Sequence, residues 1–290
     1  MKTRVLISGG CGFLGSHVAA ELVSLGAEVH ALDDGSSCWL SGFGPDGPAP
    51  SDEDPPRFTL PCVKYHGSIG RTPAVEVVCH LALAYPLHRD PVEFARAFRG
   101  FVSLGVELFE RSRSARTLRR FVVGTCLGSS GERDPLTAIR GSLESALTYW
   151  HRPPHLAIEF TRLPELFGPR QVPENGTVGR LLTGVVPPDG FHPGNAFHHV
   201  AFVKDAAKVL AERCLTTVHR HQTEFFVGGH VADPCHLAEE LRDLGFSTVI
   251  PLQEGAEQIG RVDATATATP LRDALLETAK WYQAEGVVRG

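Results

Sequence analysis

Apolar positions along the chain form two kinds of pattern, short continuous runs and longer stretches with helical spacing. Continuous runs rich in Val, Ile, Leu and Phe are typical of buried strands, and a period near 3.6 residues is typical of helices. The expected strands are Arg4–Ser8, Glu28–Leu32, Val63–His66, Val75–Leu81, Phe121–Gly124, His155–Arg162 and Thr223–Val227. The expected helices are Gly12–Leu25, Pro91–Arg113, Ala138–Trp150 and Val203–Cys214. Because strands and helices alternate, the pattern predicts an α/β fold with a doubly wound parallel sheet.

Two stretches show neither the continuous apolar runs of strands nor the apolar spacing of helices. The segment Gly35–Pro61 is rich in Gly, Pro, Ser and Asp, and it is expected to be a long loop. The segment Gly168–Ala196 is also rich in Gly and Pro, which argues against a continuous core element. Two interpretations of this second segment stay open, a loop that covers a ligand pocket and an ordinary surface connection.

The most informative motif joins the first expected strand to the first expected helix. Residues Ile7 to His17 read I-S-G-G-C-G-F-L-G-S-H, with glycines at Gly9, Gly12 and Gly15. Glycines at a strand-to-helix turn let the backbone approach a pyrophosphate, which the helix N-terminus attracts. Asp33 ends the second strand, where an acid typically binds the ribose hydroxyls of a dinucleotide. The motif therefore predicts a dinucleotide site.

Composition excludes several other classes of function. The chain has 290 residues and a formal net charge of −5, so neither nucleic acid nor an anionic membrane is an expected partner. No apolar run approaches the roughly 20 residues that span a bilayer. Seven cysteines without C-x-x-C spacing favour reduced thiols in a cytoplasmic protein. The histidine pairs lack a nameable third ligand, so no metal site is expected.

Several further motifs carry a family resemblance over nearly the whole chain. They are Ser8–His17, Cys79–Ala84, Arg120–Gly131, Arg162–Gln171, Phe197–Val200 and Phe226–Gly229. In this order they resemble the landmarks of the extended short-chain dehydrogenase/reductases, which include nucleotide-sugar epimerases and dehydratases. The resemblance implies a Rossmann-type dinucleotide-binding domain over 1–165, with its sheet completed by elements near 196–228. It also implies a small C-terminal substrate lobe formed by 166–195 and 229–290.

The same resemblance implies NADPH or NADH as cofactor. The residues implied to bind it are Gly9, Gly12, Phe13, Leu14, Gly15, Asp33, Ser68, Ile69, Leu81, Ala82, Thr125 and Pro164. Asp33 repels a 2′-phosphate, and no arginine lies between it and Gly44, so NADH is the expected partner. NADPH remains acceptable if Asp33 turns away.

The chain departs from this family at its catalytic tetrad of Asn, Ser/Thr, Tyr and Lys. Aligned on Ser142, the tyrosine position holds Ile139 and the lysine position holds Leu143. The Ser/Thr position holds Cys126, with Thr125 beside it, and the asparagine position holds Phe101. Isoleucine cannot donate a proton, and leucine cannot lower the pKa of a neighbouring proton donor as lysine does. The family's usual acid–base chemistry is therefore unavailable.

The substrate site is also expected to differ. Family members that bind sugar nucleotides hold the diphosphate with arginines, and one of these is replaced at Asn195-Ala196. Arg261 is a candidate for a second diphosphate-binding arginine. Glu165 stands where the family motif has asparagine and adds a carboxylate. The expected substrate contacts are Tyr85, Cys126, Glu165, Phe167, Phe197 and His199, with Pro86, Phe191 and Tyr149 as further apolar candidates. An apolar, aromatic site suits a flat hydrophobic substrate, although each aromatic taken singly is more often a core residue.

A cofactor motif without a tetrad resembles the atypical extended reductases of aromatic polyketide antibiotic biosynthesis, such as angucyclinone ketoreductases. The resemblance implies reduction of a polycyclic aromatic ketone, with a substrate hydroxyl next to the carbonyl as proton donor. Thr125, Cys126 and Tyr85 are weak candidates for a catalytic role. Two alternatives stay open, a dinucleotide-binding pseudoenzyme and a sugar-nucleotide epimerase or dehydratase. The sequence leaves the oligomeric state undetermined.

Overall fold

The structure is a computed structural model whose described residues form two compact units. It describes residues 2–35, 60, 62–83, 91–126, 135–150, 156–173, 176–184, 198–217, 223–248 and 268–288. Unit 1 comprises Met1–Arg162 and Ala207–Phe226, and unit 2 comprises Leu163–Ala206 and Val227–Gly290. No helix among the described residues is long and apolar enough to cross a membrane.

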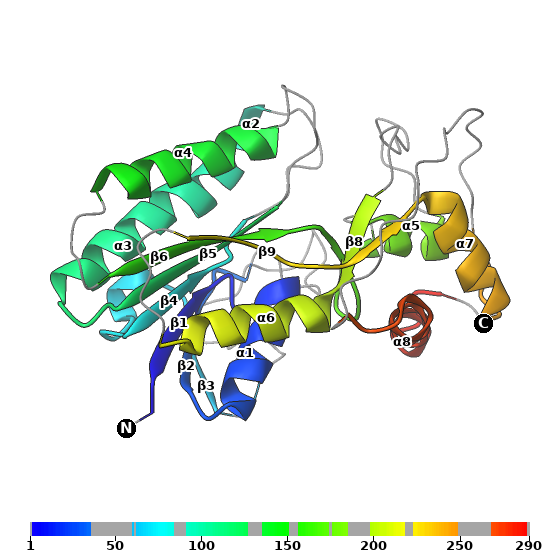
Figure 1. The fold of residues 1–290 in the computed structure, drawn as a ribbon, viewed down its shortest axis with the longest axis horizontal. Helices are drawn as coiled ribbons and strands as arrows, with labels where there is room; N and C mark the ends of the chain where they lie inside the picture. Colours follow the sequence, from blue (N-terminus) through cyan, green and yellow to red (C-terminus); the bar gives the residue numbers. More distant parts are fainter. Residues whose placement is uncertain are drawn as a thin grey trace. The chain divides into compact units, whose positions relative to one another are not determined.

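Unit 1 is built on a seven-stranded sheet (Figure 1). Its strands lie in the order β3-β2-β1-β4-β5-β6-β9, and the registers of β3–β2, β2–β1, β1–β4, β4–β5 and β6–β9 are parallel. The strands are β1 (Arg4–Ser8), β2 (Glu28–Leu32), β3 (Val63–His66), β4 (Val77–His80), β5 (Arg120–Cys126), β6 (Ala157–Leu163) and β9 (Thr223–Phe226). This sheet confirms the predicted doubly wound α/β fold, and the bounds of β1, β2 and β3 are those expected.

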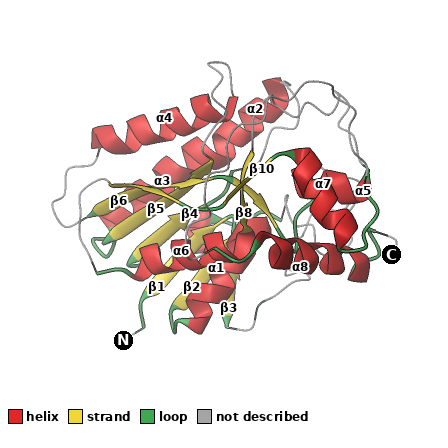
Figure 2. Ribbon diagram, turned by 45° about the vertical axis from the view of Figure 1, so that its right-hand side comes forward, coloured by secondary structure: helices red, strands yellow, loops and turns green. Residues whose placement is uncertain are grey.

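Helices cover both faces of this sheet, which explains why its central strands read as continuous apolar runs (Figures 1 and 2). On one face lie α2 (Pro91–Phe98), a π-helical segment (Arg99–Ser103), α3 (Leu104–Ser114) and α4 (Pro135–Trp150); on the other lie α1 (Phe13–Ser24) and α6 (Val203–Leu215). A short 3₁₀ helix covers Ile69–Arg71. The apolar core under α2–α4 includes Leu6, Phe101, Phe109, Phe121 and Ile139, all at most 1 % exposed.

Local sequence explains where α1 begins and ends. Val18, Ala19 and Leu22 form its buried face against the sheet. The helix ends before Gly26, whose φ of +83° is the left-handed conformation that favours glycine. The N–H groups of Gly26 and Ala27 bond back to the carbonyls of Val23 and Leu22, which is the Schellman arrangement.

The described residues of unit 2 form a three-stranded sheet and three helices. The sheet has the order β10-β8-β7, with β7 (Glu165–Phe167) parallel to β8 (His198–Phe202) and β10 (His230–Ala232) antiparallel to it. The helices are α5 (Thr177–Thr183), α7 (Pro234–Asp243) and α8 (Leu271–Ala284). Asp233 caps α7 by accepting a hydrogen bond from the backbone N–H of His236, and Pro234 fills the first helical position.

Two sequence expectations need correction here. The segment Gly168–Ala196 is not irregular throughout, because α5 lies within it and buries Val178, Leu181 and Leu182 in the core of unit 2. Gly179 serves packing, since a Cβ there would lie 2.7 Å from the Pro173 backbone. Of the region near 196–228 that was expected to complete the main sheet, β9 does so, whereas β8 pairs with β7 and β10.

The long helix expected over Pro91–Arg113 is present, but it contains the π-helical turn at Arg99–Ser103. A π-turn forms i→i+5 hydrogen bonds inside an α-helix, and the sequence analysis did not detect it within the helical spacing of this stretch. The sequence also failed to predict β7, β8, β10, α5, α7 and α8, which are short or lie in unit 2.

Candidate functional site

Five of the residues expected to bind a cofactor lie at one edge of the main sheet. Gly9, Asp33, Ser68, Leu81 and Thr125 each lie at, or just after, the carboxyl end of one of the strands β1 to β5. Because the recorded registers of these strands are parallel, their carboxyl ends share an edge. Strand order reverses between β1 and β4, and this is the point at which open α/β sheets bind ligands.

The glycine turn after β1 is shaped by backbone contacts that exclude side chains. Gly9 has φ +75°, and a Cβ there would lie 3.0 Å from the backbone of Ala82. A Cβ on Gly15 would lie 2.0 Å from the carbonyl oxygen of Gly9, so α1 packs directly on the turn. Gly12 closes the turn by donating its N–H to the Gly9 carbonyl over 3.1 Å.

Gly12 has fewer close contacts at its Cβ position than the other two glycines. A Cβ on Gly12 would lie 3.3 Å from the Gly9 oxygen, a tight contact, and within 4 Å it would meet no other described residue beyond its own neighbours. Gly12 is the N-cap of α1, and no side chain caps this helix or places an acidic group in its first turn. Helix N-termini carry unsatisfied N–H groups and a partial positive charge. The turn therefore fits a pyrophosphate, with Phe13 and Leu14 in the first turn of the helix.

Asp33 is held against this turn by both of its carboxylate oxygens. Oδ2 accepts the backbone N–H of Cys11 and Oδ1 accepts that of Gly35, each over 2.8 Å. Burial raises the pKa of Asp33 above its ordinary value, and the hydrogen bonds from Gly35 and Cys11 oppose that shift. These two N–H groups hold the carboxylate in the position in which it would repel a 2′-phosphate.

A buried histidine connects the glycine turn to two other elements. His80, at the end of β4, lies with Nδ1 2.5 Å from Ser8 Oγ and Nε2 2.7 Å from the carbonyl oxygen of Phe101 in the π-helical segment. A carbonyl only accepts, so Nε2 carries the proton and the Ser8 hydroxyl donates to Nδ1. Ser8 Oγ in turn accepts the N–H of Leu81. Burial lowers the pKa of His80 to about 4, against the opposing effect of the Phe101 hydrogen bond.

Three of the four tetrad positions hold apolar residues, and the structure buries them in an apolar environment. Ile139 and Leu143, where the family has Tyr and Lys, are fully buried, as is Phe101 at the asparagine position. All three belong to the core cluster between the sheet and α2–α4. Cys126 is the last residue of β5. Neither Ile139 nor Leu143 can transfer a proton.

Polar groups do occur beside this core, one position further along α4. Glu144 makes a two-pronged ion pair with Arg162 on β6, and Arg140 Nε lies 3.6 Å from the same carboxylate. Arg162 Nη1 also donates to the hydroxyl of Thr125 over 2.9 Å. Thr125 is 1 % exposed, so its hydroxyl joins β5 to β6 through Arg162. We interpret this cluster as fixing the carboxyl ends of the two strands.

In unit 2, the expected site residues have mostly structural contacts. Glu165 accepts the backbone N–H of Thr177 over 2.6 Å and its hydroxyl over 3.2 Å, which caps the start of α5. Phe167 is 1 % exposed and packs against Phe202, and Pro164 is also buried. His199 is half-buried on β8; burial and the nearby His230 lower its pKa.

Several expected residues lie outside the described part of the chain. These are Tyr85, Pro86, Phe191, Phe197, Asn195, Ala196 and Arg261. Tyr149, offered as an apolar pocket residue, is instead 70 % exposed on α4. Among the expected cofactor residues, Ser68 is exposed, and Ile69 packs against the core of unit 1. No group of three metal-ligating side chains occurs among the described residues.

Sequence reasoning missed the polar residues that organise this edge. Ser8 and His80 lie within the motifs Ser8–His17 and Cys79–Ala84. The sequence of these motifs does not reveal that the two side chains are hydrogen-bonded to each other. Glu144 carries no signal of its own, because its partner Arg162 is eighteen residues away in the chain. Only the packing of α4 on β6 brings the two together.

Solved structures of similar fold span nearly the whole chain. A UDP-glucose 4-epimerase from Thermotoga maritima, solved with UDP-glucose, has a TM-score of 0.73 at 19% identity and covers 98% of this chain and 99% of its own. An NAD-dependent NDP-hexosamine 5,6-dehydratase of tunicamycin biosynthesis has a TM-score of 0.70 at 19% identity, covering 98% of both chains. A Bordetella bronchiseptica enzyme solved with NADH has a TM-score of 0.71 at 19% identity, covering 99% of this chain and 95% of its own.

No protein-family model and no curated protein matches the chain. At 19% identity the structural neighbours show the fold alone. These structures confirm the predicted fold, which the chain shares with sugar-nucleotide epimerases and dehydratases. The narrower resemblance to reductases of aromatic polyketide biosynthesis stays a prediction.

Proposed function

We propose that the protein is an NADH-dependent oxidoreductase. The close-packed glycine turn, the N-terminus of α1 without a side-chain cap and the position of Asp33 support a dinucleotide at the carboxyl edge of the sheet. Similar structures solved with NADH or NAD⁺ support the same cofactor. Because backbone N–H groups hold Asp33 in place, we favour NADH over NADPH.

One observation determines the kind of chemistry proposed, namely that the Tyr and Lys positions of the family are fully buried apolar residues. Ile139 and Leu143 are 0 % exposed within the core of unit 1. A general acid contributes about 10²–10⁴ in rate, and neither residue can serve as one. We therefore propose that the proton comes from the substrate, through a hydroxyl next to the reacting ketone.

The protein's own contribution is binding, orientation and exclusion of water. The bound dinucleotide supplies reducing equivalents to a carbonyl of the substrate. Gly12 and the first turn of α1 hold the pyrophosphate, and Asp33 holds the ribose hydroxyls. The apolar packing of Ile139 and Leu143 keeps water away from the Tyr and Lys positions. An internal hydroxyl has a high effective concentration, so the reaction does not require a side-chain acid.

For the substrate we propose a ketone of a polycyclic aromatic polyketide, such as an angucyclinone. Support comes from the sequence resemblance; Glu165, at the asparagine position of the family motif, caps α5 and carries no weight for the substrate. The aromatic residues expected around the substrate contribute less support, because Phe167 is a core residue and Tyr149 is exposed. Such a substrate would bring the adjacent phenolic hydroxyl that the chemistry needs.

A second candidate has a specific observation in its favour. Full-length similarity to epimerases and dehydratases of sugar nucleotides supports an enzyme of that substrate class. Those reactions need a side chain that removes and returns protons from a sugar hydroxyl, and the Tyr and Lys positions supply none here. A catalytic base would have to come from another position.

The two candidates predict different behaviour with purified protein. We would incubate it with NADH or NADPH and a panel of aromatic polyketide ketones, following absorbance of the reduced cofactor. In parallel, UDP-glucose and UDP-N-acetylglucosamine would be incubated with NAD⁺, and the sugars analysed for epimers or dehydration products. Reduction of a hydroxyketone with stoichiometric loss of NADH supports the first proposal. Sugar conversion without net loss of cofactor would replace it with the second.

A third outcome is binding of the dinucleotide with no turnover of any compound. It would favour a dinucleotide-binding pseudoenzyme. Failure of both NADH and NADPH to bind, measured by quenching of protein fluorescence, would refute the assignment of the glycine turn itself.

A further inference from the structure

The register between β1 and β4 ends on a pair of polar residues, Ser8 and His80. Both are fully buried, and Ser8 Oγ lies 2.5 Å from His80 Nδ1. Strand order reverses between these two strands, so the pair lies at the point where open α/β sheets bind ligands. Apolar residues of similar shape can replace a buried hydrogen-bonded pair at little cost in stability, so the need to fold does not by itself explain the pair.

The surroundings of His80 fix both its protonation and its orientation. Burial lowers its pKa to about 4, so the ring is neutral near pH 7. Nε2 donates to the Phe101 carbonyl over 2.7 Å, which leaves Nδ1 as an acceptor. The Phe101 ring stacks on the imidazole with ring centroids 4.8 Å apart, and a Cβ on Gly105 would lie only 2.9 Å from Nε2. Nδ1 is therefore presented to the Ser8 hydroxyl in a fixed position.

The Ser8 hydroxyl connects this fixed ring to the backbone that follows β4. Because the hydroxyl donates to His80, its oxygen is available to accept the N–H of Leu81, which it does over 3.3 Å. The same N–H also bonds to the Ser8 carbonyl over 3.0 Å, so two oxygens of Ser8 hold Leu81. A Cβ on Gly9 would lie 3.0 Å from the backbones of Leu81 and Ala82. This segment and the glycine turn are therefore in direct contact, and moving one displaces the other.

We propose that His80 is a positioning residue for the dinucleotide, acting through the Ser8 hydroxyl on the contact between Leu81–Ala82 and the glycine turn. The inference rests on the dinucleotide site proposed above. Binding groups must be held within about 0.5 Å of the productive geometry by side chains whose own orientation is fixed by packing and hydrogen bonds. Without the His80–Ser8 hydrogen bond, the segment and the turn lose a contact that fixes their spacing, and the affinity for the dinucleotide falls.

The test measures the dissociation constant of NADH by fluorescence titration at pH 7.5 for the unmodified protein, Ser8→Ala, His80→Gln and the double variant. His80→Gln keeps a donor for the Phe101 carbonyl but removes the acceptor at the Nδ1 position. We expect each single substitution to weaken binding about tenfold, since each removes the same hydrogen bond. The double variant should also lose about tenfold, and not about a hundredfold, because two residues that act through one interaction are not additive.

A third substitution separates positioning from a merely structural role. His80→Asn places an amide oxygen near the position of Nδ1, so it still accepts from Ser8, although it loses the donor to Phe101. It also removes more buried volume than His80→Gln does, so it should be the less stable of the two in urea unfolding. We nevertheless expect His80→Asn to bind NADH more tightly than His80→Gln. A structural role predicts the opposite order, with affinity following stability.

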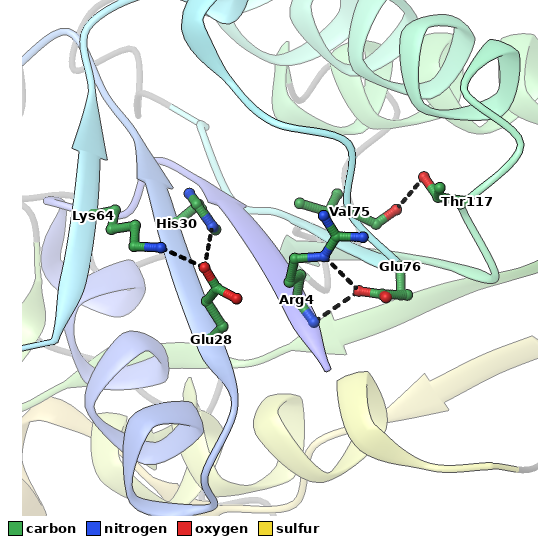
Figure 3. Close-up of polar contacts among 7 residues, drawn as sticks. All are labelled: Arg4, Glu28, His30, Lys64, Val75, Glu76 and Thr117. Atoms are coloured by element: carbon green, nitrogen blue, oxygen red, sulfur yellow. Dashed lines mark hydrogen bonds and ion pairs between the residues drawn. The ribbon is translucent and has the colours of Figure 1, made fainter. Parts of the chain in front are cut away.

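Thr117→Val is the matched control for the loss of a hydroxyl group. Thr117 donates to the Val75 carbonyl over 2.9 Å (Figure 3). The two residues precede β5 and β4, at the edge of the sheet opposite the glycine turn. This substitution should reduce stability and leave the dissociation constant of NADH unchanged.

The outcomes distinguish this inference from the proposed function. If neither NADH nor NADPH binds to the unmodified protein, the dinucleotide site is refuted and the inference falls with it. If NADH binds equally tightly to the unmodified protein and to Ser8→Ala, or if the losses add in the double variant, only the positioning role of His80 is overturned. If a His80 variant does not fold, Ser8→Ala is compared with Thr117→Val, and equal affinities would count against the proposal.

Discussion

Protonation of His80 is expected to make the stability of this protein strongly dependent on pH in mildly acidic solution. The folded structure needs the neutral imidazole, because Nδ1 accepts from Ser8 and Nε2 donates to the Phe101 carbonyl. The pKa of His80 falls from 6.5 to about 4 in the folded protein. Between these values the unfolded chain binds more protons than the folded one, so stability is present above pH 6.5 and is lost as pH falls.

The size of the effect follows from the interval between the two pKa values. At 1.36 kcal/mol per pKa unit, the full loss is about 3.4 kcal/mol below pH 4. Between pH 7.5 and 4.5 the expected loss is about 2.5 kcal/mol, a large fraction of the 5–15 kcal/mol typical of a folded domain.

The assay is urea unfolding followed by circular dichroism at pH 7.5, 6.5, 5.5 and 4.5, for the unmodified protein and His80→Gln. Other groups contribute to the pH dependence of both proteins, so the difference between their slopes reports His80. The exposed His236→Gln is the matched control and should behave like the unmodified protein. Parallel slopes for the unmodified protein and His80→Gln would refute the reasoning. If His80→Gln does not fold, NMR titration of the His80 ring decides the matter, and a pKa near 6.5 would count against it.

Further predictions concern the site. Gly15→Ala should destabilise the fold, since its Cβ would lie 2.0 Å from the Gly9 oxygen. Gly12→Val should destabilise it less, because its Cβ would lie 3.3 Å from the same oxygen, and should abolish NADH binding; thermal unfolding and fluorescence titration separate these effects. Asp33→Asn should shift preference from NADH toward NADPH by about tenfold, because it removes the charge that repels a 2′-phosphate, and unchanged ratios of dissociation constants would contradict the assigned role. Thr125→Val and Cys126→Ala should each cost less than about tenfold in turnover, below the 10²–10⁴ of a true general acid. Methylating the substrate hydroxyl beside the ketone should cost far more than either substitution, and equal rates for the methylated and parent ketones would exclude a substrate-derived proton.

The sequence alone predicted the framework of unit 1. Strands β1, β2 and β3 have the bounds expected from the sequence. β1 contains a continuous apolar run because it is a central strand of a sheet that helices cover on both faces. The glycine turn could be placed because its spacing follows from a local requirement: the backbone at Gly15 lies so close to Gly9 that neither position has room for a side chain. The absence of a proton-donating side chain at the Tyr and Lys positions also followed from residue identity at Ile139 and Leu143.

Other features depended on packing between distant segments, and these the tertiary structure decided. The π-helical turn at Arg99–Ser103 places the Phe101 carbonyl against His80, and the sequence analysis did not detect it. Helix α5 forms within a Gly- and Pro-rich segment because tertiary burial outweighs weak local propensity. The pairing of Glu144 with Arg162, and of Arg120 and Arg213 with Glu159, likewise joins residues far apart in sequence. A charge pattern along the chain records which residues are ionic, but only the folded backbone determines which of them meet in a low-dielectric interior.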